Sequence, residues 1–205
     1  MVIEKWITSN RASDKAVYFR KVFSVANSKR VILKISALGW FKAFINGKSI
    51  TDEEFLPGWT DYTKRVLLFS YDITSLIKEK NVISVAVGKG WALGTILFGE
   101  LKKYYQIPTP CLYARLEFEN EKGEICVEEF DGWKFGYGSI IENDIMLGET
   151  QDYYQENKEF FQESFDASQW EDVKIFNRRL QVEDKILPRV SVHEIFVGKR
   201  LGNGI

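Results

Sequence analysis

The side chains that are best suited to bind a ligand are aromatic, acidic and amide residues, most of which lie in the segment 37–62. The candidate residues are Asn46, Trp59, Asp61, Tyr62 and Trp91. An aromatic ring can stack on the C–H face of a sugar, and carboxylates and amides can bind its hydroxyl groups, so we interpret these residues as candidate carbohydrate contacts. Aromatic loop residues also seal the ends of β-sandwiches, and from the residues alone both interpretations stay open.

Oxygen ligands for a metal ion are available in the same segment. Asp52 and Glu53 are candidate calcium ligands, because calcium is bound by several oxygen atoms on a loop. The two acids could equally belong to a solvated turn. Two cysteines and one histidine cannot form a typical structural zinc site. Calcium is therefore the one candidate cofactor, and no cofactor is certain.

Catalytic chemistry has a weaker basis in the sequence. Glycoside hydrolysis needs two carboxylates roughly 5–10 Å apart, and a chain with 29 acids holds such a pair somewhere by chance. A Ser-His-Asp triad would have to use His193, the only histidine, which lies in an alternating segment without a nearby nucleophile motif. A small stand-alone glycoside hydrolase is therefore one of the alternatives, and we do not expect this chain alone to be an enzyme.

Charge and hydropathy argue against several classes of partner. The net charge is −1, from 28 basic and 29 acidic residues that are dispersed along the chain, so we expect no nucleic-acid or membrane partner. The glycines of Gly88–Gly94 do not fit a phosphate-binding loop. The segment 1–15 lacks the apolar core of a signal peptide and is expected to lie across the surface, with Trp6 and Ile7 as anchors. We therefore expect a cytoplasmic protein.

The elements that must position these residues are β-strands. Alternation of apolar and polar residues, together with turn residues, predicts strands at 17–25, 31–37, 40–46, 65–73, 82–87, 112–118, 125–130, 133–135 and 190–197. Asn46-Gly47 is a hairpin-turn signal, and residues 72–80 predict one or two helical turns. The segments 95–110 and 136–173 lack clear periodicity and are expected to be loops.

The same pattern predicts an all-β fold with little helix, in one domain over residues 1–205 whose core spans about 16–197. In the hairpin predicted near residue 121, Cys126 opposes about Glu117 and Cys111 opposes about Gly132. The two cysteines would not face each other, so we expect no disulfide, which fits a reducing compartment.

The order of the motifs resembles the N-terminal β-sandwich domain of bacterial α-L-rhamnosidases of glycoside hydrolase family 78. The motifs that carry this resemblance, in chain order, are residues 18–23 (YFRKVF), 44–48 (FINGK), 56–62 (LPGWTDY), 71–74 (YDIT) and 88–91 (GKGW). Gly148-Glu149 with Asp152-Tyr153 is similar to a Gly-Glu-x-Tyr-Asp-Ala-Arg segment of the family, although the Asp is displaced and the Ala-Arg is missing. The Gly-Trp motif also lacks the aromatic residue that usually follows it.

The resemblance covers roughly residues 16–195 and implies a jelly-roll-like, galactose-binding-like β-sandwich. It also implies a position before an (α/α)6 catalytic barrel, which is absent from this chain and would be its partner. The implied function is that of a non-catalytic domain that supports the barrel. Some related sandwiches bind L-rhamnose with calcium, so an autonomous rhamnose-binding module, with a rhamnose-containing glycan as partner, is the alternative.

Overall fold

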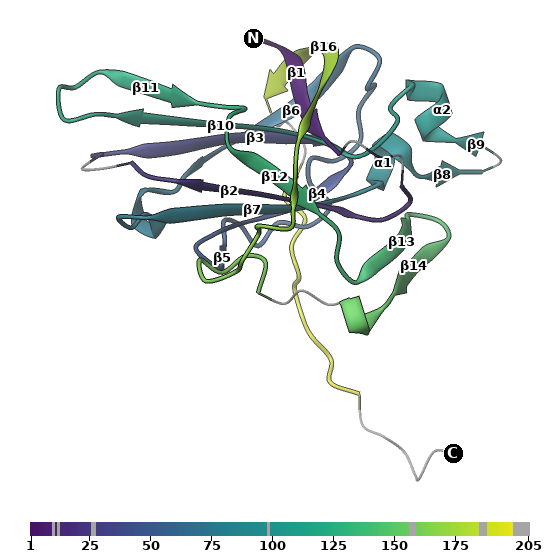
Figure 1. Ribbon diagram of the computed structural model, residues 1–205. Coiled ribbons are helices and arrows are strands. Elements are labelled where there is room, and N and C mark those ends of the chain that lie inside the picture. The colour runs from purple at the N-terminus through teal and green to yellow at the C-terminus, as the bar shows by residue number, and fades with distance from the viewer. Residues whose placement is uncertain are drawn as a thin grey trace.

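Two six-stranded β-sheets lie face to face as two layers (Figure 1). The structure is a computed structural model, and it describes residues 1–9, 11, 13–25, 28–97, 99–155, 159–184 and 188–198. The first sheet contains, in spatial order, β1 (Val2–Thr8), β16 (Lys174–Asp184), β6 (Arg65–Asp72), β3 (Val31–Leu38), β10 (Cys111–Glu119) and β11 (Ile125–Glu128). The second contains β15 (Glu171–Asp172), β12 (Trp133–Gly136), β2 (Val17–Phe23), β7 (Asn81–Gly88), β4 (Trp40–Ile45) and β5 (Lys48–Ser49).

The main core fills the space between these sheets because inward side chains alternate with outward ones along each strand. In β4, Phe41, Ala43 and Ile45 are buried, whereas Lys42 is exposed. The fold is an all-β, jelly-roll-like sandwich, as the sequence predicts. Most of the strands predicted between residues 17 and 135 are confirmed to within a few residues.

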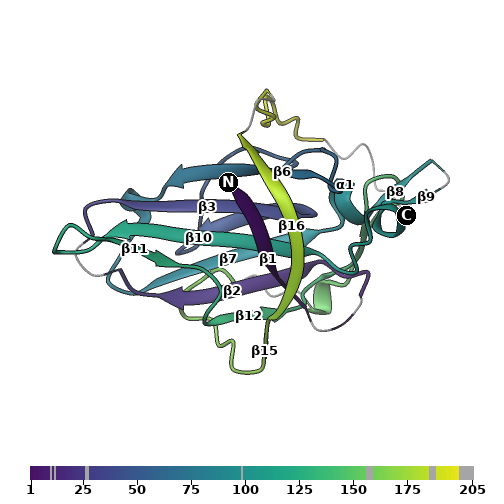
Figure 2. The same ribbon diagram turned by 90° about the horizontal axis from the view of Figure 1, so that it is seen from above.

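The strand that closes the first sheet is β16, and the sequence prediction placed the last strand at Val190–Val197 instead. That prediction is wrong, because the described part of 190–197 is extended and exposed, with a single β-bridge between Ser191 and Glu53. β16 runs parallel to β6 and antiparallel to β1. Figure 2 shows β1 and β16 crossing the direction of β3 and β10.

The N-terminal segment, which was expected to lie across the surface, is part of the first sheet. β1 pairs with both β16 and β10, and Ile3, Trp6 and Ile7 are buried. Trp6 and Ile7 are anchors, as predicted, but they lie within a strand because β16 supplies a hydrogen-bonded neighbour that is about 170 residues away in sequence. The core therefore extends to residues before position 16.

The loop regions also hold small elements that the sequence did not indicate. They are α1 (Gly90–Leu93), β8 (Thr95–Ile96), β9 (Gly99–Glu100), α2 (Leu101–Tyr105), the hairpin β13 (Ile140–Asp144) and β14 (Gly148–Gln151), and the short 3-10 helix η2 (Tyr153–Gln155). The helical segment predicted at 72–80 contains one short 3-10 helix, η1 (Thr74–Leu76). None of the helices in the described ranges is long and apolar enough to cross a membrane.

The cysteine positions differ slightly from the predicted register. Cys126 opposes Phe118, one residue from the predicted Glu117, because the turn between Glu119 and Ile125 is centred on residue 122. Cys111 lies opposite Leu38 and Thr8 rather than near Gly132, and both thiols are free. Burial raises the pKa of the Cys111 thiol to about 12, which keeps it protonated at neutral pH.

Candidate functional site

The five predicted carbohydrate contacts separate into two groups in the structure. Asn46 lies at the far end of β4, where its side chain bonds to Leu76 O, Asn81 Oδ1 and Val82 N–H at 2.8–2.9 Å. Tyr62 is fully buried and donates a 2.6 Å hydrogen bond to the carbonyl of Gly58. Both side chains therefore form hydrogen bonds that stabilise the fold.

Asp61 has a local role at the start of β6. Its carboxylate accepts hydrogen bonds from the backbone and hydroxyl of Thr63, and Lys64 lies 3.3 Å away. The Thr63 bonds are the largest cause of the lowered pKa of Asp61. Its carboxylate therefore stays charged and fixes the turn that leads into the strand.

Trp59 and Trp91 are brought together, as a shared ligand site would require. Their rings stack at 4.7 Å with an angle of 7° between the planes, and Trp59 is 49% exposed. The indole N–H of Trp59 donates a 3.2 Å hydrogen bond to the hydroxyl of Tyr105 on α2. Trp91 and Tyr105 therefore hold the Trp59 ring in place, while the exposed half of this side chain can meet a ligand.

Trp40, which the sequence analysis did not select, connects the stacked pair to a concave surface. It makes an edge contact with Trp91 and a tilted contact with Phe55. Gly90 permits this arrangement, because its φ is +48° and an added Cβ would lie 2.6 Å from the Trp40 ring. The signal that could have identified Trp40 is its place at the start of a strand that ends in the Asn-Gly turn.

These rings form a groove of about 480 Å³, which we call the aromatic groove. It is lined by Trp40, Glu53, Glu54, Phe55, Leu56, Pro57, Gly58, Phe69, Trp91, Pro188 and Val190. Its walls are mostly apolar, and two carboxylates lie at its edge. A groove of this size and composition can hold a small molecule with apolar parts.

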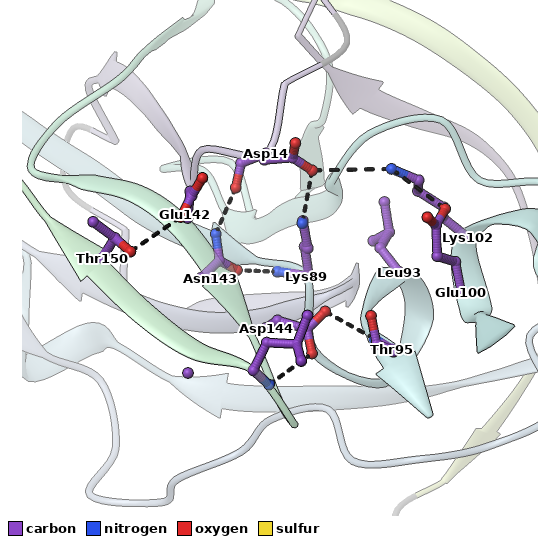
Figure 3. Close-up of a pocket in the computed structure, with 12 residues that line it drawn as sticks. Asp14, Lys89, Leu93, Thr95, Glu100, Lys102, Glu142, Asn143, Asp144 and Thr150 are labelled. Atoms are coloured by element: carbon purple, nitrogen blue, oxygen red, sulfur yellow. Dashed lines mark hydrogen bonds and ion pairs between the residues drawn. The ribbon is translucent and has the colours of Figure 1, made fainter. Parts of the chain in front are cut away.

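A second cavity, of about 320 Å³, also borders α1, through Leu93, and we call it the polar pocket. It is lined by Asp14, Lys89, Leu93, Thr95, Glu100, Lys102, Glu142, Asn143, Asp144, Leu147, Gly148 and Thr150. Asp14 Oδ1 lies 2.7 Å from the Lys89 ammonium and 3.9 Å from that of Lys102, and Figure 3 marks both contacts. The hydrogen bond from Lys89 is the largest cause of the lowered pKa of Asp14.

The hairpin β13–β14 is attached to the sandwich through two polar residues of this pocket. Asn143 accepts a 2.6 Å bond from the Lys89 N–H and donates to the Asp14 carbonyl at 3.0 Å. Asp144 accepts bonds from the Thr95 and Met146 N–H groups at 2.9 Å. Burial raises the pKa of Asp144, but these bonds outweigh it and lower the pKa overall. Glu142 accepts a 3.0 Å bond from Thr150 (Figure 3).

The two candidate calcium ligands do not fit that role. Arg189 forms an ion pair with Asp52 and lies 3.9 Å from Glu53, so a cation of the protein already lies beside these carboxylates. The described residues also contain no group of three or more His, Cys, Asp or Glu side chains that could hold a metal ion. His193 lies in the exposed segment after Val190.

Comparison with known proteins gives a consistent set of relatives. The family model "Alpha-L-rhamnosidase N-terminal domain" matches residues 26–194. An α-L-rhamnosidase of Formosa agariphila is 35% identical over 164 residues, which are 78% of this chain and 18% of that protein. An α-L-rhamnosidase of Streptomyces avermitilis is 32% identical over 143 residues, or 69% of this chain and 14% of that protein.

Solved structures agree with the sequence relatives. The native α-L-rhamnosidase of Aspergillus terreus superposes with a TM-score of 0.76 and 32% identity, over 83% of this chain and 21% of that one. The Streptomyces avermitilis α-L-rhamnosidase, solved in complex with L-rhamnose, gives a TM-score of 0.72 and 30% identity, over 79% and 16% of the two chains. This chain therefore corresponds to less than a quarter of each of these proteins.

Proposed function

Since this chain belongs to the α-L-rhamnosidase N-terminal domain family, we propose that it is a non-catalytic domain of an α-L-rhamnosidase and supports the catalytic barrel of that enzyme. The family supplies the reaction, the hydrolysis of α-L-rhamnosides, and the chain supplies a surface for contact with the barrel.

The observation that carries this proposal is an exposed apolar segment. Val192, Ile195, Phe196 and Val197 are 60%, 80%, 83% and 89% exposed in an extended stretch. A contiguous run of large exposed apolar side chains is typical of a surface that another part of a protein covers. Apolar side chains that point to both sides of an extended backbone are also typical of a strand that enters a second sheet.

A chimeric enzyme tests the proposal. In the Streptomyces avermitilis relative, the equivalent segment is replaced by this chain, with or without Val192→Ser, Ile195→Ser and Phe196→Ser. We expect the unmodified chimera to hydrolyse 4-nitrophenyl α-L-rhamnoside and the triple variant to lose activity and thermal stability. The 205-residue chain alone should show no turnover.

The matched control uses exposed apolar residues elsewhere on the fold. Ile125→Ser, Val127→Ser and Met146→Ser change side chains that are 69%, 44% and 62% exposed, and the chimera should tolerate them. Equal losses in both triple variants would contradict a contact surface at 192–196. Turnover by the isolated chain would contradict the non-catalytic role.

A second candidate function is carbohydrate binding, and the polar pocket favours it. A cavity with carboxylates, an amide and a hydroxyl offers the hydrogen-bonding groups that sugar hydroxyls need. Trp91 of the Trp59–Trp91 pair belongs to α1, whose Leu93 lines the pocket, and the pair could stack on a neighbouring sugar unit. The relative solved with L-rhamnose makes that sugar the first ligand to test.

Titration of L-rhamnose into the chain, followed by NMR with and without calcium, tests this second function. We expect saturable shifts that Glu142→Gln weakens, because Glu142 lines the pocket and bonds to Thr150. Glu124→Gln, in the exposed turn between β10 and β11, is the control and should leave binding unchanged. Shifts that do not saturate at millimolar sugar would rule this function out.

A further inference from the structure

The aromatic groove combines aromatic walls with an acidic mouth. Trp40, Phe55 and Trp91 all line it. Asp52, Glu53 and Glu54 come directly before Phe55 in sequence, and Glu53 and Glu54 also line the groove. Neither the carbohydrate function nor the support of a catalytic barrel accounts for this combination.

The three rings pack against one another at different angles. The Trp40 and Phe55 centroids are 4.8 Å apart with an angle of 55° between the planes, and those of Trp40 and Trp91 are 5.9 Å apart at 83°. They therefore form one continuous aromatic wall of the groove. Phe55 is 54% exposed, so this wall is accessible from solvent.

The ion pairs at the mouth leave an excess of negative charge. Glu54 pairs with Lys42 at 2.8 Å, and Asp52 and Glu53 share the guanidinium of Arg189. These contacts bring three carboxylates and two cations together, so the formal charge of these five side chains is −1. Such a mouth attracts cations and repels anions such as carboxylates or phosphates.

We propose that the aromatic groove binds a small organic cation that carries methyl groups, of the quaternary ammonium class. The faces of aromatic rings attract cations through their quadrupoles, and aromatic walls of this kind recognise methylated ammonium groups. The methyl groups also suit the apolar walls formed by Leu56, Phe69 and Val190. A primary ammonium is more strongly hydrated and would lose more water on entering the groove.

The test uses two ligands of the same shape and different charge. Choline is titrated into the 205-residue chain in parallel with 3,3-dimethylbutan-1-ol, which replaces the quaternary nitrogen by carbon. Tryptophan fluorescence and NMR report on the site. We expect choline to saturate in the millimolar range and to bind about tenfold more tightly than the neutral alcohol. Equal affinity for the two compounds, or no saturation by choline, would overturn the proposal.

Paired variants locate the binding. Phe55→Leu keeps an apolar side chain but removes a ring, and it should weaken choline binding about fivefold. Tyr104→Leu removes a ring that is 69% exposed outside the groove and should change nothing. Thermal melting confirms that both variants fold. Equal losses in the two variants would overturn the proposed location. So would a dimer in sedimentation that Phe55→Leu dissociates and choline does not affect, because a second copy would then fill the groove.

Discussion

The side chains at the two ends of β4 lie in different surroundings, one enclosed by the fold and the other beside a groove. At its C-terminal end, Asn46 is enclosed by hydrogen bonds to the segments around Leu76, Asn81 and Val82. At its N-terminal end, Trp40 contacts Phe55 and Trp91 and borders the aromatic groove. A polar residue beside a tight turn thus stabilises the fold, whereas an aromatic residue beside a short helix helps to form a surface that a ligand can reach.

The largest effect is expected at the enclosed end. Asn46→Ala removes the bonds to Leu76 O, Asn81 and the Val82 N–H, and Asn81 is fully buried. We expect the free energy of unfolding to fall by about 3 kcal/mol, because buried groups lose their partners. Urea denaturation measures the change. Asn177→Ala, at an exposed position of β16, is the control and should cost less than about 0.5 kcal/mol. A similarly small fall in the free energy of unfolding for Asn46→Ala would contradict a structural role for this end of β4.

A smaller loss is expected from Tyr62, the buried residue that the sequence placed among the ligand contacts. Tyr62→Phe keeps the ring in the core but leaves the Gly58 carbonyl without its 2.6 Å bond. We expect a loss of about 1.5 kcal/mol in denaturant unfolding. Choline and L-rhamnose titrations of the folded variant should match those of the unchanged chain. A selective loss of sugar binding in this variant would indicate that Tyr62 does contact the ligand.

In the polar pocket, the Asp144 carboxylate is held by hydrogen bonds from the N–H groups of Thr95 and Met146. The folded pKa of Asp144 lies below its ordinary value of 3.8, so its charged form stabilises the fold at neutral pH. That contribution is present above about pH 4 and is lost as the pH falls through the lower folded pKa. In melting curves from pH 5 to pH 2, Asp144→Asn should start lower and decline less steeply than the unchanged chain. Parallel curves would show that the hairpin does not depend on this carboxylate.

The smallest effect on stability is expected at the mouth of the aromatic groove. Arg189 is 56% exposed at its side chain, and exposed ion pairs contribute little. Arg189→Ala should therefore change the unfolding free energy by less than about 0.5 kcal/mol. Because one of the two cations is removed, choline should bind about twofold more tightly at low salt. Weaker binding of choline would contradict an electrostatic role for the acidic mouth.

Most of the sandwich could be predicted because strand alternation is a local property. Val31, Leu33 and Ile35 predict the buried face of β3 whatever the strand pairs with. β1 and β16 could not be found in this way. β16 reads KIFNRRLQVED, with consecutive polar residues, and it forms a strand because β1 and β6 provide hydrogen-bonded neighbours. Conversely, 190–197 alternates well but finds almost no such neighbour in the described residues.

By itself, the sequence determined the turns, the alternating strands and the family. Asn46-Gly47 forms a turn because both residues accept a positive φ, of 51° and 81°. Gly90-Trp91 marks the place where a helix meets Trp40 closely. Only the tertiary structure decided which candidate side chains face a ligand. Residues 40, 55 and 91 converge on one groove, while Tyr62 is buried a few residues from the exposed Trp59. Local pattern fixes the face of a strand, whereas contact between distant segments depends on how the whole chain closes.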